Sequence, residues 1–347
     1  MGSAGEGLFA QIPVRVALKN SLAESHATLG VKNDAAVHLR ARQAIVNLDY
    51  GEPSANRKTS IAFADESLLQ KLRHEWWQRA QDYAPAPYVF DGDRPRSLAD
   101  DAAWLARQTS QHLDALLGYQ ITVDASPMAV SFRHDVGRNV ALIGAGEATV
   151  EIANICLSLA TQAGQAVDFI FLEFTDNDHF WTSRRDDVFS AIRAAGSHVA
   201  ARSRNQVAGA LSELAGSLGS DPYPAGHKVI VVGLGMERCR SIPMDFQDIC
   251  RNGPISGIHV IGWWTKLDSF REQVGYGGEN YFDTKIALKL DASSAKQFMN
   301  DPLLEWHPAD NRALVWDSTE HAEPTRIIPY TKFVAPHTRP NTIQEHT

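Results

Sequence analysis

The chain has 347 residues, of which 44% are hydrophobic, and it carries a formal net charge of −8 with an isoelectric point near 5.9. A chain of this length and apolar content can bury a substantial core as one large domain or two smaller ones. The negative charge excludes a bulk attraction to nucleic acid or to an anionic membrane, although a local basic patch stays compatible with it.

Cysteine usage and the absence of long apolar runs indicate the compartment. Cys156, Cys239 and Cys250 show no CxxC pairing and are too few for a disulfide framework, which is typical of a reducing environment. No apolar run approaches the roughly 18 residues that cross a bilayer. We therefore expect a soluble, cytoplasmic protein whose segment here makes no membrane contact.

Two stretches near opposite ends of the chain resemble each other at a nearly constant spacing of about 270 residues. The matching pairs are Val16–Lys19 with Ile286–Lys289, Gln43–Val46 with Arg312–Val315, and Glu52–Pro53 with Glu323–Pro324. Each copy predicts a strand, a polar helix-like stretch and a second strand, followed by turn residues and an extended piece.

The predicted second strands cover Ala44–Leu48 and Ala313–Trp316, and the extended piece of the later copy covers Thr325–Pro329. Residues 1–64 are then either the tail of a preceding domain, which would make the chain the last part of a longer tandem protein, or an appendage that adds strands to the same sheet.

Residues 65–115 are predicted to form a helical connector. Helical periodicity over 65–86 places Leu69, Leu72, Trp76 and Ala80 on one face, and a second helical stretch is expected from about Leu98 to Leu117. We interpret Trp76 and Trp77 as packing aromatics and not as a platform for stacking nucleic-acid bases.

From residue 139 onward, apolar strands alternate with helix-length segments. Strands are predicted at 139–143, 167–172, 228–232 and 257–262, and helices at 149–163, 188–195 and 206–218. Strands without polar alternation, separated by helices, indicate a parallel sheet covered on both faces, which is the three-layer α/β class. Ligands bind beyond the carboxyl ends of such strands, so the turn after 143 and the segments after Val232 and Ile261 should converge on one site.

The turn after the first of these strands has the context of a phosphate-binding loop, because a glycine-rich turn opens a helix there. Its residues are Gly144, Ala145, Gly146, Glu147, Ala148, Thr149, Val150 and Glu151. Against the pattern GxxxxGK[ST], Thr149 replaces the second glycine, Val150 the lysine that reaches the β- and γ-phosphates, and Glu151 the Mg²⁺-binding hydroxyl. A plain strand-to-helix turn is the alternative interpretation of this loop.

The end of the third predicted strand provides an independent test of whether the chain has the residues of a P-loop hydrolase. A P-loop hydrolase ends this strand with an aspartate for Mg²⁺, commonly followed by a glutamate that activates water. Here the strand continues into Gly233 and Leu234, and the first carboxylate is that of Glu237. Both halves of the hydrolytic chemistry are missing together, so no catalytic residue is predicted.

Taken in order, these segments resemble the FtsK/SpoIIIE family of hexameric P-loop ATPases, which includes DNA translocases and the tandem-domain motors of type VII secretion. The matching pieces are 118–132, 139–146, 228–232, 251–261 with the family's "GxHLI" strand at 257–261, and the closing segments 286–294, 311–315 and 327–330. The departures are Val150, Glu151, Gly233 and Leu234, with Trp263-Trp264-Thr265 where active members often carry a polar sensor.

The resemblance implies a three-layer, RecA-like P-loop NTPase fold for 116–335, a parallel sheet flanked by helices, with the N-terminal appendage before it and a flexible tail at 336–347. It also implies a degenerate ATPase domain that binds ATP and Mg²⁺ weakly at most and serves as a scaffold or regulatory module of a larger DNA-translocating or protein-exporting ATPase. The alternatives are part of an active translocase whose hydrolysis is done by upstream domains or neighbouring subunits, and a nucleotide-free interaction protein. Expected partners are other copies or domains of a ring ATPase, DNA, or an exported protein.

Other chemistry has weaker candidates. Asp176, Asp178 and Asp187 faintly resemble a calcium loop but lack its glycine and its last glutamate, so a solvated charged loop over 176–187 is favoured and no metal site is predicted. Arg312 and Arg326 could reach a neighbouring subunit, although ordinary surface ion pairs are the favoured interpretation.

Overall fold

The computed structural model describes residues 11–63, 65–81, 91–100, 113–122, 125–175, 178–220, 226–239, 242 and 244–335. The chain divides into two compact units, residues 1–89 and 90–347. Within the described ranges, no helix is both long and apolar enough to span a bilayer. The predicted tail at 336–347 and most of the predicted stretch from Leu98 to Leu117 lie outside the described residues.

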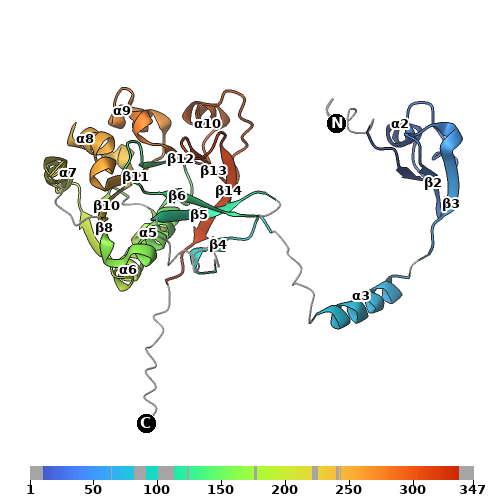
Figure 1. Cartoon of the computed structure of the whole chain (residues 1–347), viewed down its shortest axis with the longest axis horizontal. Coiled ribbons are helices and arrows are strands. Elements are labelled where there is room, and N and C mark those ends of the chain that lie inside the picture. The colour runs from blue at the N-terminus through green and yellow to red at the C-terminus, as the bar shows by residue number, and fades with distance from the viewer. Residues whose placement is uncertain are drawn as a thin grey trace, which may run out of the picture. The chain divides into compact units, whose positions relative to one another are not determined.

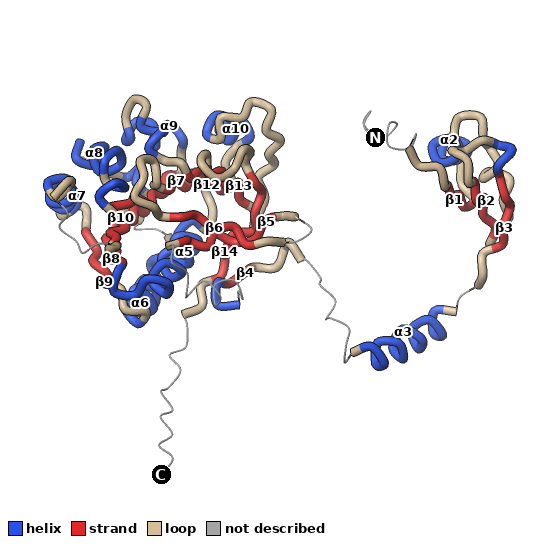
Figure 2. The backbone as a smooth tube through the Cα atoms, viewed as in Figure 1, coloured by secondary structure: helices blue, strands red, loops and turns tan. Residues whose placement is uncertain are grey.

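The first unit contains a small antiparallel sheet. Its elements are β1 (Arg15–Leu18), α2 (Leu22–Leu29), β2 (Gln43–Asn47), the short 3₁₀ turn Pro53–Ala55 and β3 (Asn56–Ser60), with strand order β1-β2-β3 (Figure 2). The side chain of Ser21 and that of Glu24 close a reciprocal capping box at the start of α2. A core of Ala17, Leu29 and Ile45, with Ala36 and Leu39, holds the unit together.

The predicted helix of the connector forms as α3 (Glu66–Ala80), which begins at the Asp65 N-cap. None of its residues is buried, and Trp76 and Trp77 are 62% and 44% exposed. The interpretation of these two residues as packing aromatics is therefore wrong. A helix of this kind depends on its cap and local propensity, because it has no buried apolar face.

The second unit is built on a sheet of 11 strands. In spatial order these are β6 (Pro127–Ser131), β5 (Asp114–Gln120), β14 (Thr325–Lys332), β13 (Ala313–Asp317), β12 (Thr284–Leu288), β7 (Val140–Ile143), β11 (Ile258–Trp264), β10 (Lys228–Leu234), β8 (Val167–Glu173) and β9 (His198–Arg202), with β4 (Arg96–Ser97) beside β14. The strands from β12 to β9 are parallel, whereas β13, β14, β5 and β6 extend them with antiparallel pairings. The predicted α/β class is confirmed, but the sheet is mixed where a parallel one was expected.

Helices cover both faces of this sheet, as the three-layer prediction required (Figure 1). One face packs on α5 (Ala148–Ala163) and α6 (His179–Ala194), and the other on α7 (Val207–Gly216), α8 (Met244–Asn252), α9 (Leu267–Val274) and α10 (Ala292–Phe298). Alternation along the strands explains the two cores: Ile230 and Val232 of β10 belong to the first, whereas Val229 and Val231 belong to the second.

Three local predictions need correction. The expected helix through Leu117 is wrong at its end, because Asp114–Gln120 is a strand between β6 and β14. The expected charged loop is helical from His179, so Arg184 and Asp187 lie on α6 as an i,i+3 ion pair. The strand His198–Arg202 was missed.

Candidate functional site

The glycine loop joins β7 to α5 and is fixed by backbone contacts. The N–H of Gly144 donates to the Trp264 carbonyl at 2.9 Å, and the indole N–H of Trp263 donates to the Gly144 carbonyl at 2.9 Å. Gly144 has a φ of +121°, and a Cβ there would lie 1.6 Å from the carbonyl oxygen of Leu288. Only glycine fits this position. The loop thus lies at the carboxyl edge of the parallel strands, where α/β sheets bind ligands.

The predicted loop residues divide by exposure. Ala145, Gly146 and Glu147 are exposed, whereas Ala148, Thr149 and Val150 are buried in the first turn of α5. The Thr149 hydroxyl donates to the Asp178 Oδ1 at 2.9 Å, and Val150 belongs to the apolar core. The side chain at the position of the phosphate-binding lysine is therefore a packing residue.

Glu151 occupies the position of the Mg²⁺-binding hydroxyl and is 1% exposed. No side chain of the described residues hydrogen-bonds its carboxyl oxygens. Burial raises the pKa of Glu151 well above its usual range, against the smaller lowering effect of the Tyr330 backbone. Burial thus favours the protonated, uncharged form of this carboxyl, which is a poor ligand for a metal ion.

A cavity of about 370 Å³ lies beside the loop. Its charged lining residues are Asp93, Glu147, Glu151, Lys289, Asp310 and Arg312. The Lys289 ammonium forms an ion pair with Asp310, and the Arg312 guanidinium donates to the Gly92 carbonyl and to the Asp93 carboxylate. Both cations of the cavity are thus already engaged within the second unit.

The pKa of Glu147 is shifted by its surroundings in the same cavity. Burial raises its pKa most, while Lys289 lowers the pKa and Asp310 raises it. The side chain makes no capping hydrogen bond to the first turn of α5. An approaching phosphate would therefore meet carboxyl groups at the helix N-terminus that normally attracts anions.

At the end of β10, Gly233 and Leu234 carry no polar side chain. A Cβ on Gly233 would lie 2.4 Å from Met236 Sδ, and Leu234 is fully buried. The N–H of Thr265, which follows β11, donates to Glu237 Oε2 at 3.2 Å. The structure thus brings the sensor-position residue to the first carboxylate after β10, at the same edge of the sheet as Gly144.

The remaining candidate residues have local structural contacts. Asp178 caps α6 by accepting from the Trp181 N–H at 2.8 Å, and Asp176 lies outside the described residues. Arg326 donates to the Glu305 carbonyl. Arg312 forms the expected surface ion pair, with Asp93, whereas the contact of Arg326 is a hydrogen bond to a backbone carbonyl.

Sequence reasoning missed Lys289 and Asp310 as neighbours of the loop. Lys289 stands in the internal repeat, which was a usable signal, but its place beside Gly146 follows from the parallel pairing of β12 with β7. The sequence gives no local sign of that pairing. Asp310 precedes β13 and comes to the loop through the same long-range contacts.

Together, the mixed sheet, its two helical layers and the glycine loop between a central strand and a long helix define the ATPase-type α/β fold. The chain matches no protein-family model, and no curated protein matches it.

Two solved structures share the fold. One is the cytoplasmic domain of the Thermomonospora curvata type VII secretion ATPase EccC, with a TM-score of 0.57 and 16% identity over 95% of this chain and 42% of that one. The other is T. curvata EccC (ATPases 2 and 3) in complex with a signal sequence peptide, with a TM-score of 0.50 and 11% identity over 91% of this chain and 58% of that one. The chain therefore has the fold of these ATPase domains and spans between two fifths and three fifths of their lengths.

Proposed function

We propose that the second unit is a catalytically degenerate ATPase-like module of a larger translocating ATPase, acting as a scaffold or regulatory docking unit. The observation that carries this proposal is the first turn of α5, where Val150 packs in the core and Glu151 is buried with a raised pKa. A phosphate loop needs a lysine and a hydroxyl at these two positions. Neither function can be performed by the residues present.

Electrostatics supports the same conclusion. The cavity beside the loop brings four carboxyl groups toward the place of the phosphates, and its two cations are already ion-paired or hydrogen-bonded. Phosphate catalysis depends on cations and donors directed at the transferred group. The residues present do not fit a Mg²⁺–nucleotide complex, so hydrolysis would belong to other domains of the assembly.

Protein export is the favoured context over DNA translocation. Two of the structures with the same fold are from a type VII secretion ATPase, and one of them is in complex with a signal sequence peptide. The net charge of −8 gives the chain no bulk attraction to DNA. We infer that an exported protein, or another domain of the secretion ATPase, is the partner of this module.

Residues 11–60 are proposed to be a second copy of the closing strands of such a domain. β1 and β2 pair Val16 with Val46 as β12 and β13 pair Ile286 with Val315. Arg42 and Asn311, which lie directly before the matching segments Gln43–Val46 and Arg312–Val315, both have positive φ. The helix between the first two strands is N-capped by Ser21 in one copy and by Asp291 in the other. This agreement supports a tandem arrangement of related domains.

Calorimetric titration of the whole chain with ATP and Mg²⁺ tests the proposal. We expect no heat of binding below millimolar concentration and no phosphate release. The T149G/V150K/E151T variant, which restores GxxxxGK[ST], should bind Mg²⁺–ATP more tightly than the wild type, whereas V150K alone, the matched control, should not, because it lacks the hydroxyl. Micromolar Mg²⁺-dependent binding with turnover by the wild type would overturn the proposal.

The partner class needs a separate measurement. Binding of labelled duplex DNA, followed at several salt concentrations, is expected to be absent at physiological salt. Binding whose logarithmic association constant falls linearly with the logarithm of salt concentration would instead assign the module to a DNA translocase.

A further inference from the structure

A second cavity, of about 460 Å³, lies at the opposite edge of the sheet, where the strands β8 and β10 begin. It is lined by Phe132, Arg133 and His134 after β6, by the end of α5 at Gln162 and Ala163, and by Lys228 at the start of β10, among other residues. Its volume is in the range of small-molecule sites. No residue of the degenerate phosphate loop lines this cavity.

Lys228 is the unusual residue of this cavity. It is 7% exposed, and within the described part of the chain its ammonium makes no hydrogen bond or ion pair. Burial lowers its pKa to about 8. The Lys228 Nζ is not fully buried, so the ammonium reaches the cavity that this residue lines. A largely desolvated ammonium binds an anion more strongly than a fully solvated one.

The carboxylate adjacent to Lys228 in the register of β8 and β10 lies on the other face of the sheet. Lys228 pairs in register with Val167, and Val229 pairs with Asp168. Since paired residues point to the same face and successive ones to opposite faces, Asp168 lies across the sheet from Lys228. There it contacts His227, with Nε2 and Oδ2 3.2 Å apart. Asp168 is therefore unable to neutralise the Lys228 ammonium.

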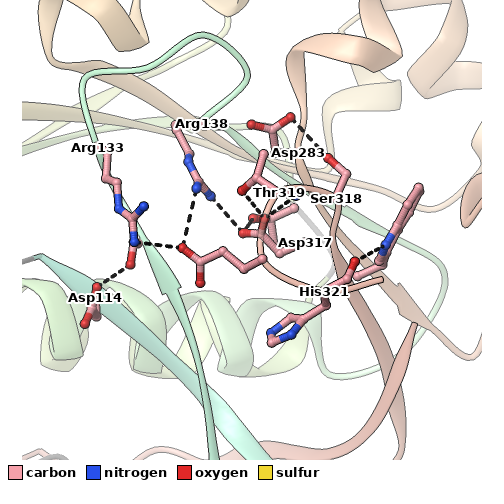
Figure 3. A network of polar contacts seen from close by, with 12 residues as sticks. Asp114, Arg133, Arg138, Asp283, Asp317, Ser318, Thr319 and His321 are labelled. Carbon is pink, nitrogen blue, oxygen red and sulfur yellow. Dashed lines mark hydrogen bonds and ion pairs between the residues drawn. The ribbon is translucent and has the colours of Figure 1, made fainter. Parts of the chain in front are cut away.

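The rest of the lining consists of Arg133, His134, the polar residues Ser131 and Gln162, and apolar side chains or glycine. Arg133 contacts Glu320 at 3.0 Å within the polar network of Figure 3. Its side chain is half-exposed, so part of the guanidinium is open to a ligand. His134 contacts the Ile255 carbonyl at 3.3 Å. No carboxylate lines the cavity in the described residues. The carboxyl end of α5 adds partial negative charge, which helps to keep Lys228 charged.

We propose that this cavity binds a small organic anion, with its phosphate or carboxylate group on Lys228 and Arg133 and its apolar part against Phe132 and Val167. The buried ammonium supplies a charge-assisted hydrogen bond, and the exposed guanidinium supplies a second. Phe132 is 2% exposed and packs edge-on to His259, so the apolar wall is preformed. The two polar lining residues, Ser131 and Gln162, already donate hydrogen bonds to Asp114.

Titration calorimetry of the whole chain tests this site with three probes. Phenyl phosphate and benzoate carry both the charge and the ring, whereas benzyl alcohol carries the ring alone. We expect the two anions to bind and benzyl alcohol not to bind. Lys228→Met should weaken phenyl phosphate binding by about tenfold or more, which is the effect of one hydrogen bond to a charged group.

Lys285→Met is the matched control, because Lys285 is also largely buried, with its ammonium over the rings of Phe298 and Trp316. This variant should bind phenyl phosphate as the wild type does. Competitive acetylation read by mass spectrometry should show that phenyl phosphate protects Lys228 and leaves Lys285 unprotected.

Three results would overturn the proposal. They are the absence of anion binding to the wild type, binding that survives Lys228→Met unchanged, and equal protection of both lysines. Phosphate bound at the Gly144 loop would survive Lys228→Met, so the second result also identifies that alternative site.

Discussion

At the scale of single residues, one buried ion pair joins the start of β7 to the end of β13. Arg138 is 5% exposed and Asp317 is fully buried, and their Nη1 and Oδ2 atoms lie 2.9 Å apart (Figure 3). The second carboxylate oxygen accepts from the hydroxyl and the N–H of Thr319 at 2.7 and 3.0 Å, and Thr284 donates to the first at 3.1 Å. The carboxylate is thus satisfied on all sides, which is the condition for a buried charge to persist.

Asp317→Asn is expected to destabilise the second unit by about 1.5–3 kcal/mol, because it removes the buried charge partner of Arg138 and leaves only the partly exposed Glu320, whose Oε1 lies 3.4 Å from Arg138 Nη2. Asp187→Asn, which removes the exposed partner of Arg184, should cost no more than about 1 kcal/mol. Urea unfolding of the two variants measures the difference. Equal losses would show that the Arg138 pair is no more important than a surface contact.

The effect of Asp317 should also depend on pH. Burial acts to raise the pKa of Asp317, but the Thr319 hydrogen bonds, Arg138 and Thr284 together lower it below its usual range. Stability from a lowered carboxyl pKa is present above the unfolded-state pKa of about 3.9 and is lost as pH falls through the folded-state pKa. The destabilisation by Asp317→Asn should therefore shrink in acid.

Glu151→Leu is expected to stabilise the second unit by about 1–3 kcal/mol at pH 7, since it removes a buried and poorly satisfied polar group. The raised pKa of Glu151 means that the folded state holds a proton that the unfolded chain releases above about pH 4.3. The part of the penalty that is linked to this proton therefore exists above that pH and is lost below it, whereas the cost of the unpaired neutral carboxyl stays. Thermal unfolding between pH 3 and pH 7 measures the trend, and Glu213→Gln on the exposed side of α7 serves as the unaffected control.

At the scale of elements, the sequence predicts the strands that are buried along most of their length. β7, β8, β10 and β11 were predicted because a strand buried on both faces is apolar along its whole length. β9 was missed because it is a short edge strand, His198–Arg202, with polar residues at both ends. The first turns of α6 were read as a loop because Arg184–Asp187 carries the charges of a solvated helix face.

The antiparallel half of the sheet shows a different limit. Asp114–Gln120 has an apolar centre, Ala-Leu-Leu, that suits a helix as well as a strand. Its partners decide the outcome: Ile328 of β14 pairs with Tyr119, and Val130 of β6 pairs with Ala115. The same limit applies to the cavities. The glycines of the loop can be recognised from the local sequence, whereas the positions of Lys289 and Lys228 depend on the pairing of their strands with β7 and β8.

At the scale of the whole molecule, the two copies of the closing strands differ in what covers them. Ala17 and its counterpart Ala287 are both buried on the side of the following helix, α2 or α10. On the opposite side, Ile286 and Leu288 are 0% and 5% exposed in the core that includes α5, whereas Val16 and Leu18 are 57% and 56% exposed. The face of β1 that matches the α5-covered face of β12 is therefore exposed, which the proposed relation between the two segments accounts for.

The double variant V16K/L18K is expected to remove most of the fluorescence that the wild type produces with the hydrophobic dye 1-anilinonaphthalene-8-sulfonate, because the exposed apolar face of β1 becomes charged. Its circular dichroism should not change, since neither side chain is buried. I286K/L288K, the equivalent change in β12, should instead unfold the second unit and increase dye binding, because it buries two unpaired ammonium groups. If V16K/L18K binds the dye as the wild type does, the face of β1 is not an open docking surface, and the tandem-domain interpretation of the first unit loses its structural support.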